Sequence, residues 1–213
     1  SGSDMARFLV VFDVDSTLIN EEAIEVLADE AGVREQVAQI TEAAMRGELD
    51  FSQSLKLRVE MLAGIPQEKL ESVQKKLTLT KGAMELVEVI HQKGGLAAVV
   101  SGGFHELLEP IRLALNLDYV KANNLEIKAG LLTGKVREPI VDRTTKAEFL
   151  ESIRQELGLS KEQTIAVGDG ANDIDMIQQA GLGIAFCAKP ALRQVADVSI
   201  DNRDLAEIIS LLP

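Results

Sequence analysis

The chain has 213 residues, of which 46% are hydrophobic, and its formal net charge at pH 7 is −12. This length suits one large domain, or a core domain with a smaller insertion. The negative charge disfavours nucleic acid and anionic membrane surfaces as partners, and no stretch approaches the ~20 apolar residues of a membrane span. The single cysteine allows no internal disulfide, so we expect a cytoplasmic protein.

The chain begins with an apolar run that ends in two carboxylates. Residues 1–4 are expected to be an expression-tag remnant, and no signal peptide is expected before Met5. Residues 7–12 predict a strand, and Asp13 and Asp15 follow it. Alternate residues of an extended chain share a face, so both carboxylates can be aimed at one point beyond the sheet edge, where open α/β sheets bind ligands. Two carboxylates so close require a cation or a shared proton, which indicates an enzyme.

Residues 21–80 carry helical periodicity, with breaks at Gly32, at residues 47–50 and at residues 64–66. This pattern predicts three or four short helices that form a separate cap domain. The spacing supports an insertion, because a plain βαβ unit takes roughly 30 residues and far more than that separates Asp13 from Ser101 at the end of the next predicted strand.

Beyond the predicted cap, the chain alternates between strand-like and helix-like segments. Strands are predicted over residues 96–100, 164–167, 182–186 and 198–200, and helices over 82–92, 146–157, 173–179 and 190–195. Residues 119–141 are expected to be irregular and to hold a β-hairpin flap around Gly130. The alternation predicts an α/β protein: a doubly wound parallel-sheet core of residues 5–20 and 81–213, with the cap of residues 21–80 inserted.

Two more predicted strands also end in polar residues. Ser101, Gly102 and Gly103 offer a hydroxyl and flexible backbone amides at the start of a helix, where an anion can be held. The strand over residues 164–167 is followed by Gly168-Asp169-Gly170-Ala171-Asn172-Asp173. A capped helix start would explain that stretch alone. Polar chemistry at three strand ends favours a catalytic site instead.

Charge balance predicts a cation at this sheet edge. A phosphate dianion ~4 Å from one carboxylate costs about 8 kcal/mol at an effective dielectric near 20. Asp13, Asp15 and Asp169 together would exclude a phosphate ester, and a Mg²⁺ held by their oxygens reverses that effect. Lys146 opens a predicted helix, where its charge is unfavourable to the helix dipole, so a role at the site is favoured there.

Taken in order, these motifs resemble those of the haloacid dehalogenase superfamily and, within it, of the phosphoserine phosphatases. The four motifs are Asp13-Val14-Asp15-Ser16-Thr17, Ser101-Gly102, Lys146 and Gly168-Asp169-Gly170-Ala171-Asn172-Asp173. The resemblance extends over residues 8–204, with longer matching stretches at 44–51, 57–59, 99–104 and 180–190.

The resemblance implies a Mg²⁺-dependent phosphatase with a Rossmann-like core. It would convert O-phospho-L-serine to L-serine and phosphate through an aspartyl-phosphate intermediate, as the last step of serine biosynthesis. The implied catalytic residues are Asp13 as nucleophile, Asp15 as general acid and then base, and Ser101 and Lys146, which bind phosphoryl oxygens. The implied metal ligands are Asp13, Asp15 through its backbone carbonyl, Asp169, and Asp173 in or near the same shell. The implied substrate contacts are Gly102, Ser101, Lys146 and Asn172 for the phosphate, Glu22 for the ammonium, Arg58 for the carboxylate, and Met45 and Phe51 as apolar closure.

Alternatives remain open from the residues alone. Glu22 fits dipole compensation in a first helical turn, Arg58 fits a solvated surface arginine, and Met45 and Phe51 fit core packing. The protein could transfer the phosphoryl group to an alcohol such as homoserine, hydrolyse another small phosphoester, or act as a non-catalytic receiver-like phosphorylation switch. A general acid beside the nucleophile and a cap both favour turnover. We expect a small-molecule substrate as the partner, no nucleic acid or membrane partner, and a monomer or homodimer.

Overall fold

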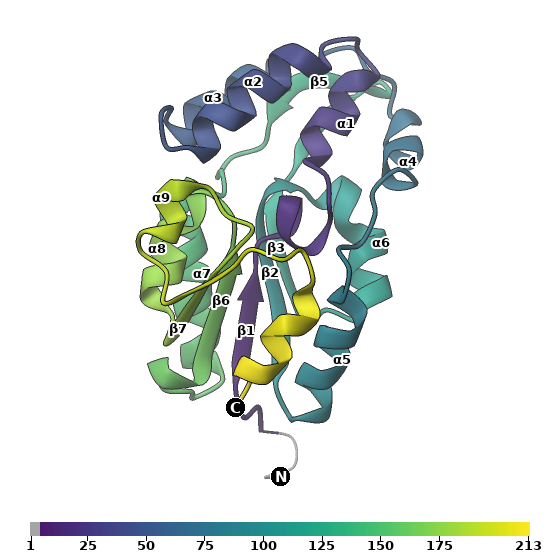
Figure 1. Cartoon of the computed structure of the whole chain (residues 1–213). Helices are drawn as coiled ribbons and strands as arrows, with labels where there is room; N and C mark the ends of the chain where they lie inside the picture. Colours follow the sequence, from purple (N-terminus) through teal and green to yellow (C-terminus); the bar gives the residue numbers. More distant parts are fainter. Residues whose placement is uncertain (1–4) are drawn as a thin grey trace.

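A six-stranded parallel sheet forms the centre of the molecule in the computed structural model, which describes residues 5–213. The tag remnant expected at residues 1–4 lies outside the described residues. The strand order is β3-β2-β1-β6-β7-β8, so β1 lies in the middle (Figure 1). The strands are β1 (Leu9–Phe12), β2 (Leu96–Phe104), β3 (Tyr119–Asn123), β6 (Thr164–Gly168), β7 (Leu182–Phe186) and β8 (Val198–Ile200).

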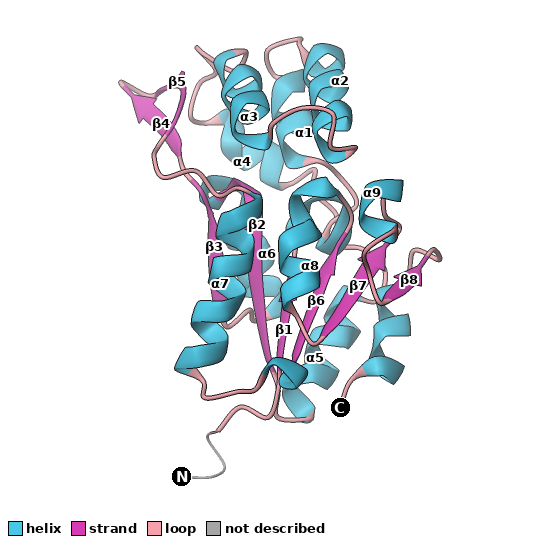
Figure 2. Cartoon of the chain, turned by 90° about the vertical axis from the view of Figure 1, so that its left-hand side faces the viewer, coloured by secondary structure: helices cyan, strands magenta, loops and turns pink. Residues whose placement is uncertain are grey.

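Helices cover both faces of this sheet, because side chains of a buried strand alternate between two faces. Val10 and Phe12 of β1 point into one apolar cluster, and Leu9 and Val11 point into the other. The first cluster is closed by α5 (Ala83–Gln92), α6 (His105–Leu115) and the 3₁₀ turns of η5 (Leu205–Leu211). The second is closed by α7 (Arg143–Glu156) and α8 (Ile174–Gln179), which lie in front of the sheet in Figure 2. The sheet is therefore doubly wound, as predicted.

Four helices lie beyond the carboxyl ends of the strands, at the top of Figure 1. They are α1 (Ala23–Asp29), α2 (Arg34–Met45), α3 (Phe51–Glu60) and α4 (Lys69–Gln74). We call these four helices the helical layer. The helices are separated where the sequence predicted breaks, and Gly32, Gly47 and Gly64 each adopt a positive φ there. The layer faces the sheet edge at which the polar residues gather.

Residues 119–141 are more regular than expected. The hairpin is present as β4 (Leu125–Lys128) and β5 (Leu131–Val136), and it rises beside α3 in Figure 2. The preceding residues, however, form β3, the edge strand of the main sheet, which pairs in parallel with β2. The expectation of an irregular segment was wrong there because an edge strand is only half covered, so Lys121 interrupts the apolar pattern.

Short helical pieces complete the chain around the sheet. They are η2 (Val14–Leu18), η3 (Lys161–Gln163), η4 (Ala171–Asp173) and α9 (Pro190–Arg193). Within residues 5–213, no helix has both the length and the apolar character needed to cross a membrane.

Candidate active site

Asp13 lies where β1 ends, at the centre of the carboxyl edge of the sheet. Its backbone N–H still donates to the Val167 carbonyl at 2.9 Å, so β1 and β6 hold it from the sheet side. Its carboxylate accepts from the Val14 N–H at 2.7 Å. The residue is 2% exposed, because the chain turns away directly into η2. A short, buried side chain on a central strand has little freedom to move.

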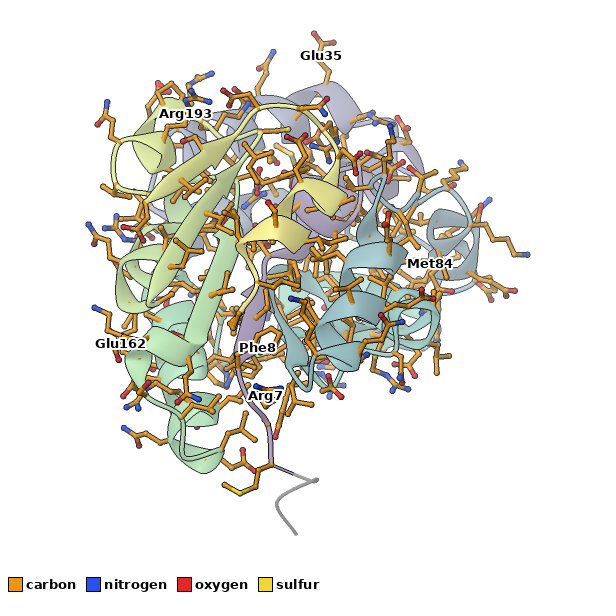
Figure 3. All side chains as sticks on the ribbon, turned by 60° about the horizontal axis from the view of Figure 1, so that its bottom comes forward. Arg7, Phe8, Glu35, Met84, Glu162 and Arg193 are labelled. Atoms are coloured by element: carbon orange, nitrogen blue, oxygen red, sulfur yellow. The ribbon has the colours of Figure 1, made fainter. Side chains whose placement is uncertain are left out.

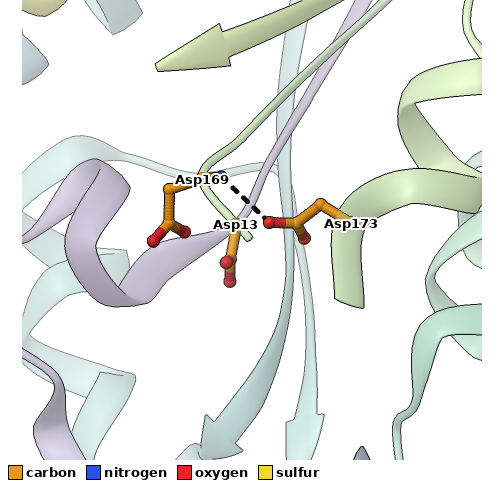
Figure 4. Close-up of side chains that lie close together, drawn as sticks. All are labelled: Asp13, Asp169 and Asp173. Atoms are coloured by element: carbon orange, nitrogen blue, oxygen red, sulfur yellow. Dashed lines mark hydrogen bonds between the residues drawn. The ribbon is translucent and has the colours of Figure 1, made fainter. Parts of the chain in front are cut away.

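Asp13, Asp169 and Asp173 form a compact carboxylate cluster (Figure 4). One oxygen from each of the three side chains lies within 4.8 Å of the others. The Asp169 N–H donates to Asp173 Oδ2 at 3.0 Å, and the Thr17 hydroxyl donates to Asp169 Oδ1 at 3.2 Å. Burial, and next the Asp13 charge, raises the pKa of Asp169 well above its ordinary value. The cluster thus holds more negative charge than a buried site tolerates by itself.

Lys146 reaches this cluster from the first turn of α7. Its Nζ lies 2.7 Å from Asp173 Oδ1 and 3.2 Å from Asp13 Oδ1, and the side chain is fully buried. The Asp142 side chain caps α7 by accepting from the Thr145 N–H at 2.9 Å, which sets where the helix begins. Burial alone would lower the pKa of Lys146, but the two carboxylates outweigh it and raise that pKa. The lysine is therefore a fixed positive charge.

Asp15 stands apart from the cluster, on the side nearer the helical layer. Its backbone is extended, and Ser16 follows with φ 59°, which turns the chain sharply back. Asp15 Oδ1 accepts from the Ala23 N–H at 3.0 Å, at the first residue of α1. Burial raises the pKa of Asp15 to about 6 in spite of that hydrogen bond. A carboxyl with this pKa can hold and release a proton near neutral pH, which is what general acid–base catalysis requires.

The carboxyl end of β2 presents backbone amides to the same space, where its pairing with β3 shifts register between Val100 and Phe104. Ser101 is fully buried, and its hydroxyl oxygen accepts from the Gly103 N–H at 2.8 Å. Asn123 of β3 supports this strand end, because its Nδ2 donates to the Gly102 carbonyl at 3.0 Å. Its Oδ1 accepts from the Val141 N–H at 2.7 Å in the segment preceding α7. Asn123 thus joins the strand end that carries Ser101 to the segment that leads into the helix of Lys146.

A cavity joins these core groups to the helical layer. Its lining residues are Asp13, Asp15, Glu22, Ile24, Thr41, Met45, Phe51, Leu55, Arg58, Gly102, Gly103, Phe104 and Asn172. Water-sized space in it amounts to about 20 Å³, enough for roughly one water molecule. A larger molecule therefore enters only if the layer moves or its side chains shift.

Two further charged residues, Glu22 and Arg58, line the same cavity as Asp15. Glu22 precedes α1 and accepts a hydrogen bond from the Ser16 hydroxyl at 2.9 Å. Burial, and next the Asp15 charge, raises its pKa well above the ordinary value. Arg58 of α3 is 4% exposed; its Nη1 donates to Thr41 Oγ1 at 3.0 Å and its Nε to the Ser54 carbonyl at 3.1 Å. A buried arginine with remaining free donors is suited to a carboxylate ligand.

Two apolar side chains of the layer rest on glycines of the sheet edge. A Cβ added to Gly102 would lie 2.3 Å from Phe51 Cζ, and one added to Gly170 would lie 2.1 Å from Met45 Cε. Neither glycine has a positive φ, so here the missing side chain provides space and not backbone freedom. The layer is therefore closed down on the catalytic edge.

Within the described residues, Asn172 Oδ1 is buried and has no hydrogen-bond partner. Asn172 also lines the cavity, so this oxygen is available to a ligand there.

The structure brings together every site residue that the sequence predicted. It adds Thr17, Thr41, Ser54 and Asn123, which position the others. Ser54 stands one helical turn before Arg58, a spacing that could have indicated it. Thr41 and Asn123 reach their partners only through tertiary packing, and no local pattern marks them.

The fold and this edge define an α/β enzyme that acts on phosphate esters: buried carboxylates and the glycines at the end of β2 line one cavity, and a buried lysine pairs with Asp13 beside it. Comparison with known proteins gives the family. Residues 10–178 match the model of the haloacid dehalogenase-like hydrolases, so the chain belongs to that family.

Curated relatives of this chain include phosphoserine phosphatases. The enzyme of Streptococcus thermophilus is 50% identical over 204 residues, which cover 96% of this chain and 95% of the relative. Phosphoserine phosphatase SerB2 of Mycobacterium tuberculosis is 53% identical, and this chain spans half of its length.

Solved structures of phosphoserine phosphatase superpose closely on this one. A phospho-aspartyl intermediate analogue has a TM-score of 0.95 at 48% identity and covers 98% of this chain and 100% of its own. A substrate-bound complex has a TM-score of 0.95 at 47% identity and covers 97% of this chain and 99% of its own.

Proposed function

We propose that this protein hydrolyses O-phospho-L-serine to L-serine and phosphate. The observation that carries the proposal is one cavity in which the sheet edge with its carboxylates meets the carboxylate of Glu22 and the guanidinium of Arg58. An amino acid carries an ammonium and a carboxylate, so Glu22 and Arg58 complement the end of phosphoserine that does not react. Its phosphate then lies toward Asp13.

The first half of the reaction transfers the phosphoryl group to Asp13. A carboxylate oxygen of Asp13 attacks phosphorus in line, and the bond from phosphorus to the seryl oxygen breaks. Protonated Asp15 donates its proton to that oxygen, so L-serine leaves with a neutral side-chain hydroxyl group. Lys146, Ser101 and the Gly102 amide bind the phosphoryl oxygens and stabilise the charge that develops there.

The second half releases phosphate, restores the Asp13 carboxylate and returns Asp15 to its protonated form. Asp15, now ionised, takes a proton from a water molecule while the water oxygen attacks phosphorus. The bond between Asp13 and phosphorus breaks, and phosphate leaves. Asp15 ends protonated, ready for the next substrate. Its pKa of about 6 suits both directions of proton transfer.

The donor set of the carboxylate cluster fits Mg²⁺. Oxygen ligands alone converge there, their charge exceeds that of Lys146, and burial disfavours leaving them uncompensated. We propose that Asp13, Asp169 and the Asp15 backbone carbonyl hold the ion, with Asp173 in or next to its shell. When bound, Mg²⁺ offsets the negative charge of phosphate and carboxylates.

A phosphate-release assay tests the reaction. Purified protein with Mg²⁺ is offered phosphoserine, phosphothreonine, phosphotyrosine and a nucleotide, with and without free homoserine. We expect phosphoserine to be hydrolysed with the highest kcat/KM and homoserine to leave phosphate release unchanged. Formation of phosphohomoserine would show phosphoryl transfer to an alcohol instead, and a lasting phosphoprotein without turnover would show a switch.

Two variants of the layer test the substrate assignment. Loss of a charge-assisted contact costs ~1.5–3 kcal/mol, so we expect Arg58→Ala to lower kcat/KM for phosphoserine about 10–150-fold. An aryl phosphate has no amino-acid end, so its hydrolysis should change little. Glu22→Gln should likewise penalise phosphoserine more than an analogue without the amino group.

The matched control is Arg46→Ala. Arg46 lies on the same layer but is exposed and pairs with Glu42 and Glu48, away from the cavity. It should behave as wild type. If Arg58→Ala lowered kcat/KM equally for phosphoserine and for the aryl phosphate, with an unchanged circular dichroism spectrum, the phosphoserine assignment would be contradicted. The protein would then be a phosphatase that acts on another substrate.

The cellular location and the oligomeric state are also proposals. A single cysteine is consistent with the cytoplasmic location that we propose. We propose a monomer or homodimer with a small-molecule substrate and without nucleic-acid or membrane partners.

A further inference from the structure

The chain crosses between the sheet and the helical layer twice, and the two crossings lie side by side. The outgoing segment is residues 18–20 and the returning segment is residues 78–80; we call them the linker pair. The Asn20 N–H donates to the Thr78 carbonyl at 3.0 Å, and the Thr80 N–H donates to the Leu18 carbonyl at 2.8 Å. Ile19 and Leu79 thus form an isolated antiparallel bridge. The two covalent connections of the layer to the sheet are thus held together by this short pairing.

A single side chain from the other end of the sequence binds both segments. Arg203 Nε donates to Asn20 Oδ1 at 2.9 Å, and its Nη2 donates to the Ile19 carbonyl at 3.1 Å. The same Nη2 lies 3.3 Å from Thr80 Oγ1 on the returning segment. The planar fork of arginine allows these contacts at once, which the single ammonium of lysine does not.

Arg203 is itself held against the sheet. Its guanidinium carbon lies 5.6 Å from the centre of the Phe186 ring, at the end of β7. Two residues later, the Leu205 N–H donates to the Lys81 carbonyl at 2.8 Å. A Cβ added to Gly82 would lie only 2.4 Å from Asp204 Oδ1, so the two segments are in tight contact. We call the contacts of Arg203 with the linker pair the clamp. The clamp is therefore anchored to β7 and to the segment that leads into α5, and not to the layer.

We infer that Arg203 is a positioning residue for the reaction, on the basis of the function proposed above. Glu22 follows Asn20 by two residues, so a small rotation of the linker pair moves Glu22, and with it the layer that carries Arg58, relative to Asp13. A misplacement of about 1 Å far from the reacting atoms can cost 10²-fold in rate. By fixing the linker pair, Arg203 fixes the distance between the groups that bind the amino-acid end of the substrate and the nucleophile.

The kinetic test uses the full chain with Mg²⁺ and the variants Arg203→Ala and Arg203→Lys. We expect Arg203→Ala to lower kcat/KM for phosphoserine roughly 10-fold or more, chiefly through a higher KM. Hydrolysis of p-nitrophenyl phosphate, which needs only the sheet edge, should stay within about 2-fold of wild type. Arg203→Lys should recover little, because it keeps the charge but loses the fork.

The matched control is Arg193→Ala. Arg193 lies on the surface at α9 (Figure 3), and it pairs with Asp201 just before the clamp without touching the linker pair. If Arg203→Ala lowered the melting temperature but kept the same substrate preference as Arg193→Ala, Arg203 would serve stability alone and the inference would be overturned.

A second measurement does not depend on the substrate. Hydrogen exchange of peptides covering residues 17–22 and 76–81 should be faster in Arg203→Ala than in wild type and unchanged in Arg193→Ala. Unchanged exchange would overturn the clamp even if phosphoserine proved to be the wrong substrate. Faster exchange without phosphoserine turnover in wild type would retain the clamp and reject the proposed function.

If Arg203→Ala does not fold, Thr80→Val provides a milder variant. It keeps the shape of a buried residue and removes one acceptor of the clamp. The same substrate preference should change in the same direction by about 2- to 5-fold. A Thr80→Val protein with wild-type selectivity and exchange would contradict the inference.

Discussion

The two sides of the cavity are built in different ways. On the sheet edge, Asp13, Asp169 and Lys146 are short-range products of strand ends and a helix start, nearly fully buried and bound to one another. On the side of the helical layer, Glu22 lies just before α1 and Arg58 lies on α3. These helices are joined to the sheet by the linker pair, and backbone hydrogen bonds between residues 64–67 and 130–132 hold them to the β4–β5 hairpin.

Under the proposed function, the chemistry falls to the sheet edge and the selectivity to the side of the helical layer. Groups that act on the transition state must be held in place before substrate binds, because reorganisation costs rate. Groups that recognise the non-reacting end of a substrate must also allow the substrate to enter the cavity. The cavity of about 20 Å³ is too small for phosphoserine as it stands, so either the layer moves or the side chains that line the cavity shift when substrate binds.

The largest expected effect comes from removing the nucleophile. Asp13→Asn keeps the shape of the side chain but removes the negative charge of the nucleophile. The variant also loses one ion-pair partner of Lys146 and one of the three carboxylates of the cluster. Turnover should fall by about 10⁴-fold or more on every substrate. Phosphate release with phosphoserine and with an aryl phosphate measures it. Full activity of a correctly folded variant would remove the covalent mechanism.

A smaller loss is expected at the general acid. Asp15→Asn should slow both halves of the reaction by roughly 10²–10⁴-fold. Because an aryl leaving group needs less protonation than a seryl oxygen, the loss with p-nitrophenyl phosphate should be the smaller one. Comparing kcat for the two substrates checks this. A variant with wild-type rates on phosphoserine would refute the acid–base role.

The support of Arg58 predicts a modest and selective effect. Thr41→Val removes the acceptor of Arg58 Nη1 and leaves a buried donor unpaired, a cost of about 1–2 kcal/mol. KM for phosphoserine should rise about 5- to 30-fold while aryl phosphate hydrolysis stays near wild type. Thr133→Val, on the β4–β5 hairpin, is the matched control. Equal losses on both substrates would mean that Thr41 stabilises the fold only.

The smallest expected effect is on stability and not on rate. Burial raises the pKa of Asp15 to about 6 and that of Asp173 to about 7. A carboxyl whose pKa is raised in the folded protein holds its proton more tightly there than in the unfolded chain. Its contribution to stability is complete below the ordinary pKa of about 4 and is lost as the pH rises through the folded pKa. In the metal-free protein, the melting temperature should therefore fall between pH 5 and pH 8.

Mg²⁺ should reverse that loss. Cation binding requires ionised carboxylates, so added Mg²⁺ should raise the melting temperature more at pH 8 than at pH 5. Differential scanning calorimetry with EDTA and with Mg²⁺ checks both points. A melting temperature independent of pH and of Mg²⁺ would argue against a metal at the carboxylate cluster.

The sequence predicted the sheet edge well because its signals are local. Apolar runs that end in Asp13 and Asp169 already place the carboxylates at one edge of a parallel sheet. The edge strand β3 was missed because Lys121 and half-exposed neighbours hide its period. Thr41 and Arg203 were not predicted, since their partners lie 17 and up to 184 positions away in the sequence and only packing brings them together.

The pairing of Ile19 with Leu79 has a consequence for how such a protein can change over evolution. The helical layer leaves the sheet and returns to it at one point, so in topological terms it is a single long loop. Closing a loop costs only about 0.6 kcal/mol more for each doubling of its length. One contiguous stretch of sequence can therefore be lengthened, shortened or exchanged at little cost to the sheet. Substrate range can diverge in that stretch while the strand ends that carry out the chemistry stay as they are.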